Sequence, residues 1–171
     1  GMYVQKYSSP NAKTVWPEWT GYDATRKTQR CLIVGDNWPE GEIDEVSTRY
    51  IQFGITAAKG TTLKIDNISM FVCGCGGNGM RCHINYSKEP NFANQHTIFS
   101  PTSMPANNML EDKTAVISLD EDETLIVRVY PWYTSKATGK TICLSDVNIS
   151  GMALDKETTQ EKGACVLALD L

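Results

Sequence analysis

Three of the six cysteines of this 171-residue chain fall close together, in the run Cys73-Gly-Cys75-Gly-Gly-Asn-Gly-Met-Arg-Cys82. Thiolates placed in this way could ligate zinc or iron, although zinc sites usually combine two C-x2-4-C pairs and this run begins with C-x-C. A Cys73–Cys82 or Cys75–Cys82 disulfide between the facing strands of a hairpin is a second alternative. We favour a third, in which the thiols pack as small apolar side chains.

The acidic run Asp120-Glu-Asp-Glu123 offers carboxylate oxygens, which calcium prefers as ligands. Asp120 and Asp122 are therefore candidate ligands of a structural calcium ion. The same run also fits a solvated hairpin turn whose charges discourage pairing between sheet edges, and we favour that interpretation. The sequence predicts no other metal and no cofactor.

A third candidate site lies in the segment 125–133, where aliphatic residues at positions 125, 127 and 129 alternate with polar and aromatic ones. In a strand, Arg128, Tyr130 and Trp132 would share the opposite face. Aromatic rings stack on the apolar surfaces of sugars, and a guanidinium group can bind hydroxyls or a carboxylate through two hydrogen bonds at once. In the alternative, the same side chains pack under the loop 88–113 or the N-terminal segment as a second small core. The ligand-binding candidates are Arg81, Arg128, Tyr130, Trp132 and Tyr133.

No residue is predicted to be catalytic. The chain has 20 acidic residues, but most fall in turns, and none belongs to a motif that pairs two carboxylates across a cleft. Neither His83 nor His96 has an evident nucleophile partner, and there is no G-x-S-x-G motif.

Composition excludes several kinds of partner. Hydrophobic residues make up 41% of the chain and charged residues 21%, which is typical of a folded globular domain. The net charge is −4 and no cluster of lysines and arginines is longer than a pair, so we expect no nucleic-acid partner. No apolar run approaches the roughly 18 residues that span a bilayer, so we expect no membrane insertion.

From residue 50 the chain reads as a series of strands separated by turns rich in glycine, proline and asparagine, and helical periodicity is absent. This pattern predicts an all-β fold, an antiparallel β-sandwich of the jelly-roll, galactose-binding-like kind. Residues 1–48 are expected to be irregular. The expected strands are 51–57, 63–72, 82–86, 97–99, 115–119, 125–130 and 141–151.

Two of these strands change register in the same way. In 63–70 and again in 142–149, apolar residues alternate, stop at a pair of polar residues and resume one position later. Because side chains alternate with a period of two, such a slip would turn the core face outward unless a β-bulge or a bend absorbs it. We therefore predict two bent strands.

Several segments together resemble a β-sandwich domain that accompanies the secreted pectate lyases and pectin methylesterases of polysaccharide-degrading gut bacteria. The resemblance covers about residues 16–153. It is carried by Arg49-Tyr-Ile-Gln-Phe53, Leu63-Lys-Ile-Asp-Asn-Ile-Ser69, Gly79-Met-Arg81, Asn85-Tyr-Ser87 with Phe92, Arg128-Val-Tyr-Pro-Trp-Tyr133 and Leu144-Ser-Asp-Val-Asn-Ile-Ser-Gly151.

The resemblance implies a non-catalytic, carbohydrate-binding-like accessory module of an exported protein that degrades a polysaccharide such as pectin. It implies a polysaccharide or oligosaccharide ligand and an attached catalytic domain. Residues 1–153 would form the single domain, and 154–171 a C-terminal strand or a linker. The alternatives are a structural spacer domain and a lyase or hydrolase that acts on uronic-acid polymers.

Overall fold

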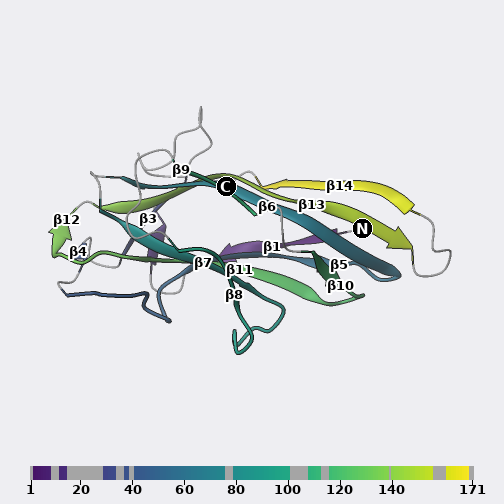
Figure 1. Cartoon of the computed structure of the whole chain (residues 1–171), viewed down its shortest axis with the longest axis horizontal. Helices are drawn as coiled ribbons and strands as arrows, with labels where there is room; N and C mark the ends of the chain where they lie inside the picture. The colour runs from purple at the N-terminus through teal and green to yellow at the C-terminus, as the bar shows by residue number, and fades with distance from the viewer. Residues whose placement is uncertain are drawn as a thin grey trace.

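The computed structural model describes residues 2–8, 12–14, 29–33, 37–38, 41–75, 79–100, 108–112, 116–138, 140–155 and 161–169. Every regular element in these ranges is a β-strand, and the strands form antiparallel sheets (Figure 1). The prediction of an all-β fold is confirmed. Among the described residues there is no helix long and apolar enough to cross a membrane.

One layer is a five-stranded sheet with the order β1-β5-β11-β7-β8. Its strand β5 alternates as predicted: Ile51, Phe53 and Ile55 are buried, while Gln52 between them is half-buried. The five strands are β1 (Met2–Ser8), β5 (Ile51–Ala57), β11 (Thr124–Trp132), β7 (Arg81–Ser87) and β8 (His96–Phe99).

The second layer is a seven-stranded sheet built around two long, mutually paired strands, β6 (Thr61–Cys75) and β13 (Thr141–Asp155). Its main path is β10-β6-β13-β3-β2, with β9 also paired to β6 and β14 also paired to β13. The shorter strands are β10 (Ile117–Leu119), β3 (Gln29–Ile33), β2 (Ala12–Thr14), β9 (Asn108–Asp112) and β14 (Glu161–Leu169). A separate pair joins β4 (Asn37–Trp38) to β12 (Ala137–Thr138).

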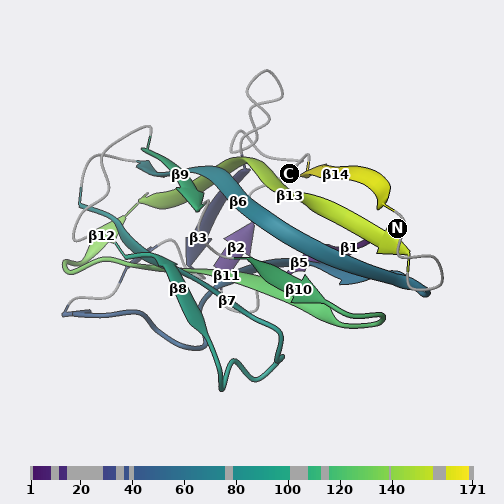
Figure 2. The same ribbon diagram turned by 45° about the vertical axis from the view of Figure 1, so that its right-hand side comes forward.

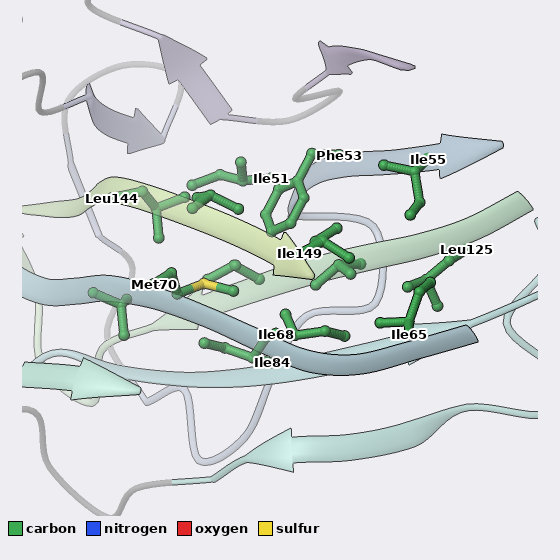
Figure 3. Close-up of a cluster of buried hydrophobic side chains, with 14 of the residues drawn as sticks. Ile51, Phe53, Ile55, Ile65, Ile68, Met70, Ile84, Leu125, Leu144 and Ile149 are labelled. Carbon is green, nitrogen blue, oxygen red and sulfur yellow. The ribbon is translucent and has the colours of Figure 1, made fainter. Parts of the chain in front are cut away.

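The main hydrophobic core lies between the two layers, which Figures 1 and 2 show from two directions. Both sheets contribute to it, and the large side chains at its centre are almost inaccessible to solvent (Figure 3). Among them are Phe53 and Ile55 of β5, Leu125 of β11, Ile84 of β7, Ile68 and Met70 of β6, and Leu144 and Ile149 of β13. The architecture is that of a β-sandwich.

The two predicted register slips are present, at separate positions along the β6–β13 pair. Ile65 pairs with Gly151 and Asn67 with Ser150, so Asp66 is an extra residue on β6. On β13 an extra residue falls between Ser145 and Asn148. Ile65 and Ile68 are both buried while Asp66 is exposed, so the bulge returns the apolar side chains to the core.

The connections differ from the expected hairpins. The glycine-rich segment was predicted to close a hairpin, but β6 and β7 belong to different sheets. The acidic turn was likewise predicted to close a hairpin, yet it joins β10 of one sheet to β11 of the other. A local turn signal marks where a strand ends, but it does not determine with which strand the next one pairs.

The chain ends also form strands. Four short strands fall within residues 1–48, the segment expected to be irregular, and β14 within 154–171 pairs with β13. Their partners are distant in sequence; β1, for example, pairs with β5. Such pairing depends on tertiary structure more than on local propensity.

A substitution at Gly151 tests the close approach of β6 and β13. A Cβ there would collide with the carbonyl oxygen of Lys64 and lie 2.8 Å from Ile65 Cα. Because the obstacle is backbone, we expect Gly151→Ala to lower the free energy of unfolding by about 3 kcal/mol in urea denaturation. Ser150→Ala, one residue away, is the control, with a change within about 0.5 kcal/mol. Equal stability of the two variants would contradict this packing.

Candidate functional site

Arg128 lies on the outer face of the five-stranded sheet, but its guanidinium group is engaged within the protein. It stacks between two rings, with Cζ 4.1 Å from the centroid of Tyr50 and 3.9 Å from that of Phe92. Its Nε donates a hydrogen bond to Gln52 Oε1 at 2.9 Å, and one Nη donates to the carbonyl oxygen of Pro90, also at 2.9 Å. Planar stacking with hydrogen bonds at the edge is the geometry that arginine favours. We call these residues the Arg128 cluster.

Tyr130 belongs to the Arg128 cluster and is 3% exposed. Its ring meets the rings of Tyr50 and Phe92 edge to face, with centroids 5.5 and 6.5 Å apart. Burial raises the pKa of its hydroxyl, and the hydrogen bond from Arg128 only partly opposes this shift. The hydroxyl therefore stays neutral, and the ring has no open face on which a sugar could stack.

Trp132 is 4% exposed and lies under the segment 41–50. Its ring is 4.7 Å from that of His83, whose Nδ1 lies 2.7 Å from Glu45 Oε2. In the same segment Arg49 forms a bidentate ion pair with Glu42 and donates to the carbonyl oxygen of Pro131. The segment is thereby fixed to the end of β11, and Trp132 packs as part of a second small core.

Arg81 and Tyr133 lie at the same end of the sheet, where Arg81 pairs with Trp132. Arg81 donates to the carbonyl oxygen of Gly79 at 3.0 Å and to Thr134 Oγ1 at 3.4 Å. The backbone amide of Tyr133 donates to Glu42 Oε2, and Lys140 Nζ lies 4.7 Å from the centre of the Tyr133 ring. The five predicted binding residues thus divide between two packed clusters.

The acidic turn holds its own backbone in place. Glu123 Oε2 accepts from the amide of Asp120 at 2.8 Å, and Asp122 adopts the left-handed conformation with φ of 64°. The backbone of the turn also bonds to Ala57, with Asp122 N donating to it and Glu123 O accepting from it. In the described part of the chain, no three side chains of histidine, cysteine or acidic residues gather as a metal site. Asp120 and Asp122 as calcium ligands stay a prediction.

Cys82 forms neither of the two disulfides considered as alternatives. Cys82 is a free thiol inside the core, where burial raises its pKa, while Cys73 is half-buried on β6. Their strands lie in different sheets, which removes the facing hairpin on which a Cys73–Cys82 or Cys75–Cys82 disulfide depended. The side chain of Cys75 lies outside the described residues. Cys82 packs as a small apolar side chain, as favoured above.

An open groove of about 400 Å³ lies where the edge strands of the two sheets, β8 and β10, approach the loop that follows β7. Its volume is within the range of small-molecule sites. We call it the edge groove. Its lining comprises Tyr86, Lys88, Glu89, Asn94, His96, Val116, Ile117 and Ser118.

The edge groove presents aromatic and aliphatic surface. Tyr86 and His96 are register partners in β7 and β8, and their rings stack with centroids 5.0 Å apart and planes at 23°. His96 is exposed, while Tyr86 also packs against the core. Val116 is 76% exposed. A groove lined by rings and an aliphatic side chain offers the contacts that the C–H faces of a sugar require.

The polar groups of the edge groove are fixed by hydrogen bonds. Lys88 Nζ donates to Glu123 Oε2 at 2.7 Å and to the carbonyl oxygen of Ser118 at 3.1 Å. Asn94 Nδ2 donates to Glu89 Oε1 at 2.7 Å. These hydrogen bonds hold the polar side chains in position and leave further donor and acceptor capacity on them, such as the second carboxylate oxygen of Glu89.

The loop 88–95 links the edge groove to the Arg128 cluster. Phe92 of this loop is 7% exposed and has a φ of 56°, an uncommon conformation for an aromatic residue. Arg128 holds the loop from the sheet side through the Phe92 ring and the carbonyl oxygen of Pro90. On its other side, Lys88, Glu89 and Asn94 line the groove.

The sequence did not predict the edge groove. His96 was considered only as a catalytic residue, and Tyr86 only as a strand residue. The register of β7 against β8 brings Tyr86 and His96 together, and no local sequence pattern contains that register. The groove also requires β10, whose partner β6 lies in the other sheet.

Replacing Arg128 tests its hold on the loop. We expect Arg128→Lys to lower the free energy of unfolding by about 2 kcal/mol, because an ammonium group cannot stack between two rings and also reach Gln52 and Pro90. We also expect the backbone amides of residues 88–94 to exchange with solvent faster in the Arg128→Lys variant. Arg81→Lys, which removes no ring stack, is the control in both measurements. Unchanged exchange in the loop of the Arg128 variant would refute this role.

Comparisons of the chain with models of protein families, with curated proteins and with solved structures found no match. The resemblance to domains of pectin-degrading proteins therefore stays a prediction, and the function has to be argued from the edge groove itself.

Proposed function

We propose that this chain is a non-catalytic, carbohydrate-binding accessory module, and that the edge groove holds the saccharide. The observation that carries the proposal is the stacked Tyr86–His96 pair in an open groove beside the exposed Val116. Ring faces and an aliphatic side chain suit the apolar faces of a sugar. The Glu89 carboxylate and the Asn94 amide are placed to bind its hydroxyls.

The wider setting of the module is proposed from the sequence resemblance. In it, the sandwich is of the jelly-roll, galactose-binding-like type, the protein is exported, and a catalytic domain is attached. A module that binds the polymer would then hold the enzyme near its substrate and raise the effective concentration. Pectin is the polysaccharide that the resemblance suggests.

A structural spacer is the second candidate, and one observation favours it. The side chains first expected to bind sugar, Tyr130 and Trp132, are buried, and Arg128 is engaged with the sheet and the loop. A spacer needs such packing and no ligand. The two candidates differ in the edge groove, which a spacer would not use.

Titration calorimetry with oligosaccharides from plant cell walls separates the candidates. For any saccharide that binds, we expect His96→Ala to weaken the affinity about tenfold, because it removes an exposed ring of the stacked pair. Ile43→Ala is the matched control, since Ile43 is 91% exposed and lies outside the groove lining. Failure of the whole panel to bind would favour the spacer, and equal affinities of the two variants would place the ligand elsewhere.

A further inference from the structure

We infer that the saccharide held by the edge groove is neutral, a chain of hexose or pentose units. A polyuronate such as polygalacturonate, the acidic part of the pectin that the resemblance suggests, would not be its ligand. This inference rests on the proposed function and narrows it to one chemical class of ligand. It follows from the charges of the groove and from the engagement of the arginines.

Lys88, which is the one lysine among the described residues of the groove lining, is ion-paired. Lys88 Nζ lies 2.7 Å from Glu123 Oε2, and the lining also contains Glu89. The described lining and its ion pair contain one lysine and two carboxylates, those of Glu89 and Glu123, so the carboxylates outnumber the lysine. A uronate carboxylate entering the groove would meet repulsion, and it would compete with Glu123 for the ammonium group.

Three arginines could bind the carboxylate of an acidic sugar, but their guanidinium groups are engaged elsewhere. Arg128 is enclosed by two rings and hydrogen-bonded to Gln52 and Pro90, and Arg49 is ion-paired with Glu42. Arg81 donates to Gly79 and Thr134. Of these three arginines, none lines the groove. The described residues of the groove lining therefore offer no bidentate guanidinium contact of the kind that recognises a carboxylate.

The surroundings of the groove add further negative charge. Glu123, which holds Lys88, belongs to the acidic turn, in which Asp120 and Asp122 are exposed. A polyanion would approach this turn against its field, whereas a neutral chain would not be affected.

The groups that remain suit hydroxyls and C–H surfaces. A carboxylate such as that of Glu89 accepts hydrogen bonds from sugar hydroxyls, and the Asn94 amide both donates and accepts. The Tyr86–His96 stack and Val116 provide the apolar contact. Such a set recognises uncharged sugar rings.

Affinity electrophoresis of the full chain in gels containing linear galactan or polygalacturonate tests the inference. We expect galactan to retard the chain at least about tenfold more strongly, with little change on adding salt, because no ion pair forms with the ligand. Stronger retardation by polygalacturonate would overturn the inference but leave carbohydrate binding intact. Retardation by neither polymer would overturn the proposed function, and this inference with it.

A charge variant tests the physical reason. Val116→Lys places an unpaired cation in the edge groove without touching the core, since Val116 is 76% exposed. We expect its affinity for polygalacturonate to rise at least about threefold at low salt. Ile43→Lys makes the same change of charge outside the groove and should leave that affinity unchanged. Equal responses of the two variants would refute local charge as the cause of selectivity.

Discussion

The stacking of Arg128 between Tyr50 and Phe92 is the interaction on which the candidate site depends. It joins the outer face of the five-stranded sheet to the loop 88–95 through two ring contacts and a hydrogen bond to Pro90. Cation–π contacts that are partly desolvated are worth about 1–2 kcal/mol each, so they offset part of the conformational entropy that the loop loses when it is ordered. The face that looked like a binding surface is thereby closed. The far side of the same loop becomes a wall of the edge groove.

The sandwich supplies the other walls. Because β10 connects to β11 across the two layers, an edge strand of the seven-stranded sheet lies near the edge strand β8 of the other sheet. The acidic turn between β10 and β11 provides Glu123, which fixes Lys88 in the groove. The bulge in β6 and the bulge in β13 keep the core faces of both long strands turned inward, so the two layers stay packed beneath the edge groove. The connections between strands that define the fold therefore also form the edge groove.

The sequence predicted what depends on local periodicity. The alternation in 51–57, the buried face of β11 and the slips in β6 and β13 were all visible, because each places apolar side chains on one face of a strand. The sequence did not reveal which distant strands pair. It suggested that β6 and β7 form one hairpin, although they lie in different sheets. The same limit applies to the site. Arg128, Tyr130 and Trp132 were placed correctly on one face, but only tertiary structure brings Phe92 and the segment 41–50 over them.

The central claim is that the edge groove, and not the outer face around Arg128, holds the ligand. Heteronuclear NMR of the chain during titration with a neutral galactan oligosaccharide tests it most directly. The account predicts that the largest shift changes fall on Tyr86, Lys88, Asn94, His96 and Val116, with little change at Arg81 or Tyr133. Changes centred on Arg81 and Tyr133, or no saturable change at any residue, would contradict it.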